Sequence, residues 1–137
     1  MKADEIAEIL DRTWMLPAVG QGALGLECRT DDHATRVLVA QLNHVDTRAA
    51  VLAERAMLRG LGGGCQVPIG VNTRFEGEEL VLTGMVASLD GQRLIRDEAR
   101  GNQNDPEAIG IALAHALRAQ GAGEILEEIF ATVRPEA

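Results

Sequence analysis

The stretch VPIGVNTRFEGEELVLTGMVAS, residues 67–88, decides the fold. From Val67 to Phe75 apolar side chains alternate with small or polar ones, which is the period of a β-strand. Glu76-Gly77 predicts a turn into a second strand over residues 80–88, and Asp90-Gly91 predicts a hairpin into a third strand over residues 93–100. The sequence therefore predicts a three-stranded antiparallel meander with one covered and one wetter face.

Helices are predicted on both sides of this meander in the sequence. Before it, an alanine- and leucine-rich segment predicts a helix capped by Asp46 and stopped by Gly60 and the glycines at 62–64. After it, Asp105-Pro106-Glu107 is typical of a helix start. The buried stripe of that helix is predicted to comprise Ile109, Ala112, Leu113, Ala116 and Leu117. Gly121 or Gly123 ends it, and a last amphipathic segment follows with Ile125, Leu126, Ile129 and Phe130. Helices packed on one face of an antiparallel sheet make an α+β fold.

Three weaker patterns precede residue 44. Residues 3–13 carry Ile6, Ile9 and Leu10 at helical spacing before Pro17. Residues 19–29 alternate as a strand that needs a sheet to join, with Cys28 as a small core residue. Residues 32–42 predict a helix capped by Asp31 or Asp32, whose apolar stripe comprises Val37, Leu38 and Leu42. We place a domain boundary near Asn43.

The charge and the hydropathy of the chain limit the classes of partner that it can bind. The 13 basic and 21 acidic residues give a net charge of -8, which repels nucleic acid. No apolar run approaches the ~20 residues needed to cross a bilayer, and the acidic start, residues 1–11, does not resemble a signal peptide. We therefore expect no nucleic-acid or membrane partner and a cytoplasmic location. The two cysteines predict no disulfide framework.

The most informative loop is LGGGCQVPIG, residues 61–70. Three glycines beside a thiol leave space that something bulky can approach, at a cost in chain entropy. A loop-borne thiol at Cys65 is suited to forming a covalent bond with a cofactor. The alternative is a glycine-rich connector with an incidental buried cysteine.

Two charged features lie upstream on the predicted helix. Arg48, Arg55 and Arg59 fall on one side of it and form a cationic stripe. The stripe either faces carboxylates of a ligand or neighbouring domain, or is an ordinary solvated face. Glu54 either pairs with a neighbour or is a helix-surface carboxylate.

Three other motifs give weaker evidence for a functional site. Residues 20–25, GQGALG, match the dinucleotide fingerprint, but a strand does not precede them and a helix does not follow, so we interpret them as a crossing or hinge. The histidines at 33, 44 and 115 lack metal-ligand spacing, and no metal site is predicted. Ser88, the single serine, is not in a nucleophile elbow.

Three blocks resemble the porphobilinogen deaminase (hydroxymethylbilane synthase) family. They are PAVGQGALGLECR at residues 17–29, LNH at 42–44 with AERA at 53–56, and GGCQVPIG at 63–70. Their order matches that of the family, and the resemblance extends across nearly all 137 residues. One departure is Gly62, where the family often has glutamate.

The resemblance implies a transferase of haem and tetrapyrrole biosynthesis that joins four porphobilinogen molecules into hydroxymethylbilane and releases ammonia. It implies a dipyrromethane cofactor bound through a thioether to Cys65. Further cofactor-binding residues that it implies are Gly64, Gln66, Arg55, Gln21 and Gly22. The family's three domains imply that residues 1–16 end the second domain, residues 17–43 return a strand and helix to the first, and residues 44–137 form the C-terminal domain.

The catalytic aspartate and most of the basic residues of the family belong to the two earlier domains. We therefore expect no catalytic residue in this chain, and inactivity of the chain alone. We expect the full-length enzyme to be a monomer that binds porphobilinogen and its oligomers, whereas the orphaned strand at 19–29 pairs with another copy or stays mobile. Two alternatives are an interaction domain that docks its cationic stripe on an acidic partner, and a dinucleotide-binding protein that depends on Gly20 and Gly22.

Overall fold

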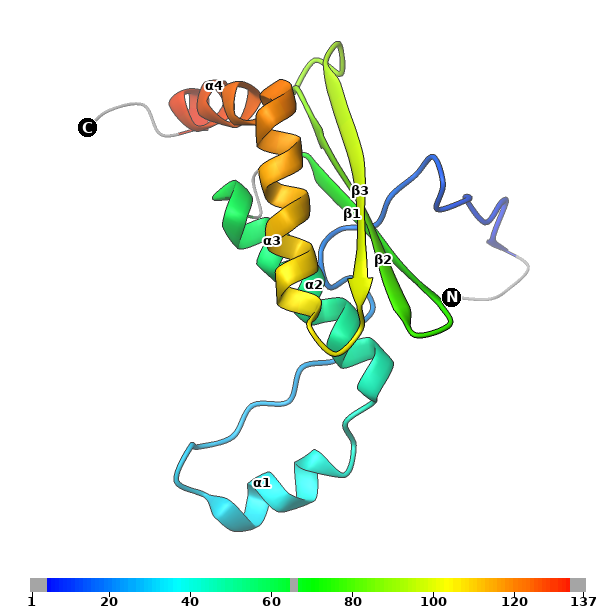
Figure 1. Cartoon of the computed structure of the whole chain (residues 1–137), viewed down its shortest axis with the longest axis vertical. Coiled ribbons are helices and arrows are strands. Elements are labelled where there is room, and N and C mark those ends of the chain that lie inside the picture. The colour runs from blue at the N-terminus through cyan, green and yellow to red at the C-terminus, as the bar shows by residue number, and fades with distance from the viewer. Residues whose placement is uncertain (1–4, 65–66, 134–137) are drawn as a thin grey trace.

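The computed structural model describes residues 5–64 and 67–133. Helix α1 (His33–Ala40) projects away from the remaining elements, which form one compact body (Figure 1). That body comprises α2 (Val45–Leu61), β1 (Ile69–Glu76), β2 (Glu79–Ala87), β3 (Leu94–Asn102), α3 (Pro106–Leu117), the wide π-type turn η2 (Arg118–Ala122) and α4 (Gly123–Val133). The predicted α+β class is confirmed.

The sheet is the predicted antiparallel meander in the order β1-β2-β3. Its register pairs Val71 with Gly84 and Thr83 with Glu98. Gly77 and Gly91 adopt positive φ in the two hairpin turns, a conformation that costs glycine little.

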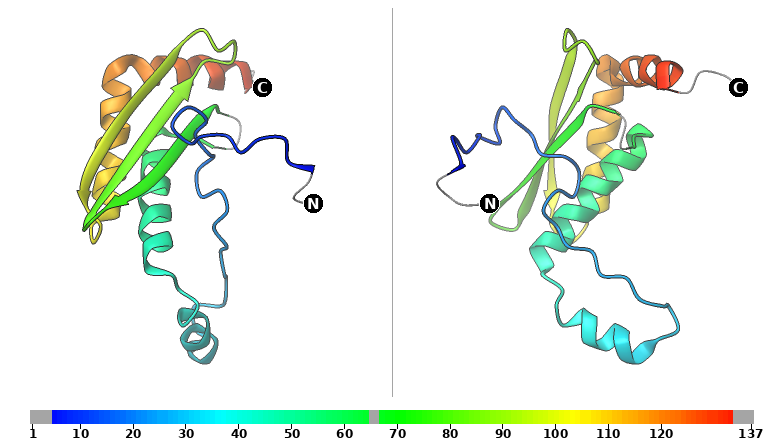
Figure 2. Two further views of the ribbon diagram at one scale, coloured as in Figure 1. Left: turned by 90° about the vertical axis from the view of Figure 1, so that its right-hand side faces the viewer. Right: turned by 180° about the vertical axis from the view of Figure 1, so that it is seen from behind.

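All the packed helices lie on one face of the sheet, and residues 5–17 lie on the other (Figure 2). The core is fully buried where Leu80, Leu82 and Val86 of β2 meet the helices. Gly84 lies among them without a side chain, because an added Cβ would be 2.5 Å from Met57 Sδ.

Helices α2 and α3 approach each other closely through small residues. A Cβ on Gly110 would lie 2.1 Å from the carbonyl oxygen of Ala53, and one on Gly60 would lie 2.6 Å from Cβ of Ala114. Gly60 is therefore a contact position inside α2, not the stop that the sequence predicted. The helix ends one residue before Gly62, which has a left-handed conformation.

Two predicted helix details are wrong. The N-cap of α2 is His44, whose Nδ1 accepts the backbone N–H of Thr47 at 3.2 Å, while Asp46 lies in the first turn. On α3 the buried positions include Gly110 and Ala114, whereas Ala112 is exposed and Ala116 half-buried. Glycine and alanine face inward here because α2 is so close.

The C-terminal helices follow the prediction. α3 begins at Pro106 after Asp105, although the Asp105 side chain makes no capping hydrogen bond. Gly121, with a φ of 101°, breaks the helix. Ile125, Leu126 and Ile129 of α4 are buried, and Phe130 packs against the core.

The segments before α2 differ more from their predictions. Residues 6–11 are not helical, and Ile6, Ile9 and Leu10 are exposed. Residues 23–29 form no regular secondary structure and join no strand of the described sheet, and Cys28 is half-buried outside the core. Both patterns need an apolar partner that the described residues do not provide, and a short helix without one is marginal.

Helix α1 forms as predicted. Asp32 accepts the backbone N–H of Thr35 at 3.0 Å and its hydroxyl at 2.8 Å, and these bonds lower the pKa of the Asp32 carboxyl. The apolar stripe of α1, however, is exposed: Val37 and Leu38 are each 65% accessible.

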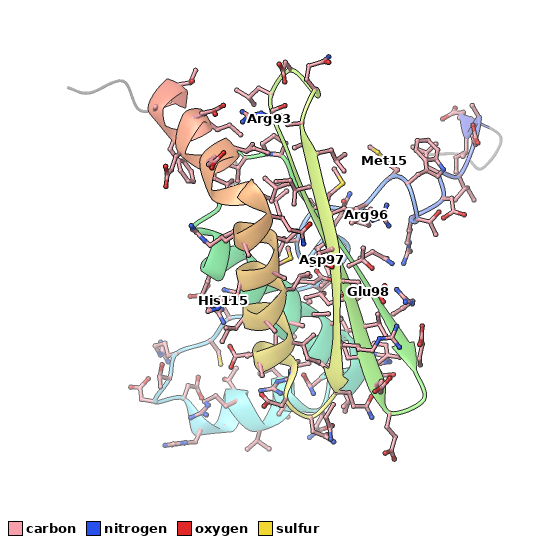
Figure 3. All side chains as sticks on the ribbon, turned by 45° about the horizontal axis from the view of Figure 1, so that its top comes forward. Met15, Arg93, Arg96, Asp97, Glu98 and His115 are labelled. Carbon is pink, nitrogen blue, oxygen red and sulfur yellow. The ribbon has the colours of Figure 1, made fainter. Side chains whose placement is uncertain are left out.

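The open face of the sheet is covered by charges and by the N-terminal segment. Arg74 contacts Glu76 and Glu98 at 2.8 Å each, and Arg100 contacts Glu98 at 3.0 Å. The carbonyl of Pro17 accepts the backbone N–H of Val71 at 2.8 Å. Figure 3 shows Arg96, Asp97 and Glu98 following one another along β3: Arg96 donates to the carbonyl of Thr13 in the N-terminal segment, whereas Asp97 accepts from Gln120 on the helix side.

Candidate functional site

The candidate cofactor loop joins the end of α2 to the start of β1. Gly64 is its last described residue on the α2 side, and Val67 is its first on the β1 side. Cys65 and Gln66, the predicted attachment residue and its neighbour, lie outside the described residues. The geometry of the site therefore comes from their two flanks.

The glycines of this loop have different roles. A Cβ on Gly63 would lie 2.6 Å from Ile69 Cδ1 and 2.8 Å from Leu58 Cδ1, so a side chain there would force these two side chains to shift. A Cβ on Gly64 would meet nothing within 4 Å, and Gly64 is exposed. The expected open space is thus present beside Gly64 but not beside Gly63.

Hydrogen bonds fix both flanks. The N–H of Val67 donates to the carbonyl of Gly64 at 3.4 Å. The N–H of Ile69 donates to Val67 at 2.8 Å, and the carbonyl of Pro68 accepts from Ala87 at 3.0 Å. The β1 flank of the loop is therefore bonded to the sheet, and its Val67 is bonded in turn to Gly64 on the α2 flank.

The glycine-rich crossing segment is the second part of the site. Gly20 and Gly22 adopt φ values of 69° and 83° in consecutive turns, and Oε1 of Gln21 accepts the backbone N–H of Ala18 at 2.9 Å. Residues 23–29 continue without regular secondary structure. A dinucleotide fingerprint needs a strand before it and a helix after it, so this segment is not one.

Glu54 joins this crossing segment to the sheet domain. One carboxylate oxygen accepts the N–H of Gly20 at 2.7 Å, and the other accepts the hydroxyl of Thr73 at 2.7 Å. The sequence analysis left Glu54 between a paired residue and a surface carboxylate. The one signal that could have identified it was a carboxylate among small, buried residues of α2.

Two open cavities flank the crossing segment. The first, about 780 Å³, lies between residues 10–23, α2 and β1, and its lining includes Gln21, Gly22 and Glu54. The second, about 1290 Å³, lies between the crossing segment, α1 and α2. Gly22 lines both cavities and so lies at their common wall, whereas Gln21 lines only the first.

The second cavity reaches toward the cofactor loop. Its lining includes Arg48, Arg55 and Leu58 on α2. Leu58 is the residue whose side chain packs over Gly63. The structure therefore brings the predicted residue Arg55 to the same cavity that Leu58, the neighbour of Gly63, lines.

The predicted cationic stripe is divided. Arg48 and Arg55 are exposed and line the second cavity. Arg59 instead donates to Glu107 of α3 at 2.6 Å, an exposed pair that links the two helices. Arg48 and Arg55 are thus exposed toward the cavity, where a carboxylate ligand could reach them, and Arg59 pairs with α3 instead.

The described residues provide neither a membrane-spanning helix nor a cluster of metal ligands. No helix among residues 5–64 and 67–133 is both long and apolar enough to cross a membrane. Within the same ranges, no group of three or more His, Cys, Asp or Glu side chains could hold a metal ion.

Comparison with known proteins identifies the family. A family model described as "Porphobilinogen deaminase, C-terminal domain" matches residues 48–119, and one described as "Porphobilinogen deaminase, dipyromethane cofactor binding domain" matches residues 1–37. Proteins named porphobilinogen deaminase are 63% identical over 134 residues in Synechococcus sp. (strain RCC307) and 61% identical over 135 residues in Synechococcus elongatus. A third, from Nostoc sp., is 56% identical over 131 residues.

These matches and the fold together define the C-terminal part of a deaminase. The chain belongs to the porphobilinogen deaminase family. The alignments cover 98%, 98% and 96% of this chain but only 42%, 42% and 41% of the three relatives. The chain thus spans about two fifths of the length of the curated relatives that it matches.

Proposed function

We propose that this chain is the part of a porphobilinogen deaminase that carries the cofactor, and that Cys65 is the point of attachment. The observation that supports this most directly is the exposed Gly64 with open space around it, next to Cys65 in the chain. Fixed backbone on both flanks would hold a tethered group at one place. The family membership supplies the identity of that group as a dipyrromethane.

The described residues fit such a group. A two-ring pyrrole chain with carboxylate side chains needs room beside its tether and cations within reach. The space beside Gly64 and the nearby cavity provide the room, and Arg48 and Arg55 on its wall provide guanidinium groups suited to carboxylates. We propose that Arg55, Gln21 and Gly22 contact the cofactor or the growing chain there, together with Gly64 and Gln66 beside the tether.

The attachment step balances without an oxidant. The Cys65 thiol loses its proton, and the thiolate sulfur forms a C–S bond to the methylene carbon of porphobilinogen while the C–N bond breaks. The amine leaves with the proton as ammonia. A thioether resists hydrolysis, so Cys65 serves as an anchor, and the bound cofactor supplies the free pyrrole end to which further units are added.

We propose that the complete enzyme joins four porphobilinogen molecules into hydroxymethylbilane in the cytoplasm, as a monomer. Residues 1–16 and 17–43 are then parts of the second and first domains, and residues 44–137 the C-terminal domain. The catalytic aspartate belongs to the part of the enzyme outside this chain. We therefore propose that residues 1–137 alone do not turn over porphobilinogen.

Mass spectrometry of the full-length protein tests the attachment. We expect a dipyrromethane adduct on the peptide that contains Cys65. Cys65→Ser should lose both the adduct and hydroxymethylbilane formation. Cys28→Ser is the matched control, because Cys28 is half-buried outside the loop, and it should keep both. Normal product formation by full-length Cys65→Ser would overturn the proposal.

A further inference from the structure

The C-terminus of α2 has two kinds of cap. The first is the glycine motif: the N–H of Gly62 donates to the carbonyl of Arg59 at 3.0 Å, and the N–H of Gly63 donates to that of Leu58 at 3.1 Å. This pattern with a left-handed glycine pairs two of the last four carbonyls of a helix.

The second cap is Arg118, which is 57 residues further along the chain than Leu61. Its Nε donates to the carbonyl of Gly60 at 2.9 Å, and its Nη2 donates to that of Leu61 at 2.9 Å. These are the two terminal carbonyls that the glycine motif leaves unpaired. One guanidinium therefore completes the hydrogen bonding of α2 immediately before the cofactor loop.

The close packing of α2 on α3 brings Arg118 to this place. Ala114 contacts α2 at Gly60, and Arg118 follows one helical turn later, at the start of the wide turn η2. The guanidinium lies between two glycines: Nη2 is 3.7 Å from the Cβ position of Gly62, and Nη1 is 3.5 Å from that of Gly123. Its fork thus lies in van der Waals contact with the position that a side chain at Gly62 would occupy.

A charged cap at this position also has a favourable electrostatic setting. The carbonyl end of a helix carries partial negative charge, and a guanidinium bound there is stabilised by it. Arginine can hold two neighbouring carbonyls with one rigid group, whereas lysine is a single flexible point charge. Arg118 can therefore fix the orientation of the last two carbonyls of α2 as well as supply a positive charge there.

The orientation of these carbonyls affects the backbone path that leads to Gly64. The glycines at 62–64 have no side chains to restrict their backbone, so the loop takes its path from its anchors. Gly63 is held from one side by Leu58 and Ile69, while the carbonyls just before it are held by Arg118. Loss of the Arg118 hydrogen bonds would free the α2 side of the loop and leave the β1 side unchanged.

We propose that Arg118 is a positioning residue for cofactor attachment: its guanidinium fixes the last carbonyls of α2 and so aims the loop that carries Cys65. This inference rests on the proposed function of Cys65. The proposed role of Arg118 requires no contact with cofactor or substrate. It acts through the backbone of residues 60–64.

The test compares rates of cofactor attachment in the full-length protein. Cofactor-free wild type, Arg118→Met, Arg118→Lys and the control Arg93→Met are incubated with porphobilinogen, and the adduct on Cys65 is followed by mass. Arg93 is a suitable control because it is an exposed arginine that pairs with Glu128, and the substitution removes the same charge (Figure 3). Thermal unfolding of each variant is measured in parallel.

We expect Arg118→Met to slow attachment about tenfold, the effect of losing roughly one charge-assisted hydrogen bond. Arg118→Lys should recover part of that rate, and Arg93→Met should attach cofactor as fast as wild type. Slowing that merely follows the loss of thermal stability in both methionine variants would overturn the inference. Attachment by Arg118→Met at the wild-type rate would do the same.

Two further outcomes are decisive. If Arg118→Met does not fold, Arg118→Lys decides, because attachment at the wild-type rate with a flexible ammonium in place of the planar guanidinium contradicts a role for the fork. A wild-type protein without any adduct on Cys65 would sink the proposed function itself. A wild type with the adduct and an equally fast Arg118→Met would sink only the inference about Arg118.

Discussion

Glu54 accepts a hydrogen bond from the backbone N–H of Gly20 at 2.7 Å across 34 residues of chain. Its other oxygen holds the Thr73 hydroxyl of β1, also at 2.7 Å. A single carboxylate on α2 therefore ties the glycine-rich crossing segment to the sheet domain. Val19, next to Gly20, packs against the edge of the same core, so polar and apolar contacts anchor this segment together.

Glu54→Gln should weaken this connection. A carboxylate accepts on both oxygens, whereas an amide presents an N–H₂ group to one of its two donors. We expect the free energy of unfolding to fall by about 1–3 kcal/mol, the cost of leaving a partly buried donor unpaired. Urea unfolding measures the loss, and faster hydrogen exchange at the Gly20 amide locates it.

The matched control is Thr73→Ser, which keeps the hydroxyl that donates to Glu54. It should lose little stability and leave exchange at Gly20 unchanged. Unchanged exchange at Gly20 in Glu54→Gln would mean that the crossing segment is held by other contacts.

Gly110→Ala tests the close contact between α2 and α3. In a helix, alanine is ordinarily about 1 kcal/mol more favourable than glycine. Here the new Cβ would lie 2.1 Å from the Ala53 carbonyl oxygen and 2.8 Å from the Met57 nitrogen, so the helices must separate. We expect a net loss of about 3 kcal/mol, measured as a lower urea midpoint.

Gly25→Ala provides the comparison, because a Cβ there meets nothing within 4 Å. Its unfolding midpoint should stay close to that of wild type. Equal stability of Gly110→Ala and Gly25→Ala would show that the α2–α3 distance is not limited by this contact.

The sheet and the C-terminal helices could be predicted because their signals are local. Alternation over residues 67–88, turn glycines such as Gly77, and the Asp105-Pro106 start each specify a backbone conformation within a few residues. The segments at 6–13 and 19–29 were predicted wrongly for the opposite reason. Their apolar periodicity is real, but a helix or strand forms only where a partner covers that face.

The roles of individual site residues were harder to predict from the sequence. Nothing near Gly110 in the sequence reveals that Ala53 and Met57, more than fifty residues earlier in the chain, exclude a side chain there. The two acceptor contacts of Glu54 and the capping contacts of Arg118 likewise join segments far apart in sequence. Cys65, by contrast, was singled out by its glycine neighbours and the family motif, and its assignment stays a prediction.

Acid should weaken the charged network on the open face of the sheet. The hydrogen bond from Arg74 lowers the pKa of Glu98 from its ordinary 4.5 to about 2, and bonds from Arg100 and Thr83 act in the same direction. A carboxyl whose pKa is lower in the folded state contributes stability that is fully present above pH 4.5. That contribution is lost as the pH falls from 4.5 towards 2.

We therefore expect the urea midpoint of wild type to fall across this range of pH, and Glu98→Gln to show a flatter dependence. Because Glu98 is about one-third exposed, solvent screening keeps the effect modest. Glu78→Gln, on the exposed turn between β1 and β2, is the control and should follow the wild-type curve. Identical slopes for wild type and Glu98→Gln would place the acid sensitivity elsewhere.

Self-association of the isolated chain should depend on residues 23–29. Leu24 is 97% exposed and Leu26 62% exposed, and the backbone there joins no strand of the described sheet. Exposed apolar side chains on a backbone whose N–H and C=O groups are not paired in a sheet favour pairing with another copy. Sedimentation of residues 1–137 should show an apparent mass that rises with protein concentration, and the double variant Leu24→Glu with Leu26→Glu should suppress this rise.

Leu89→Glu is the matched control, because Leu89 is 63% exposed on the β2–β3 hairpin, far from residues 23–29 in the chain. Equal suppression by Leu89→Glu would mean that added negative charge, and not the loss of this pairing surface, keeps the copies apart.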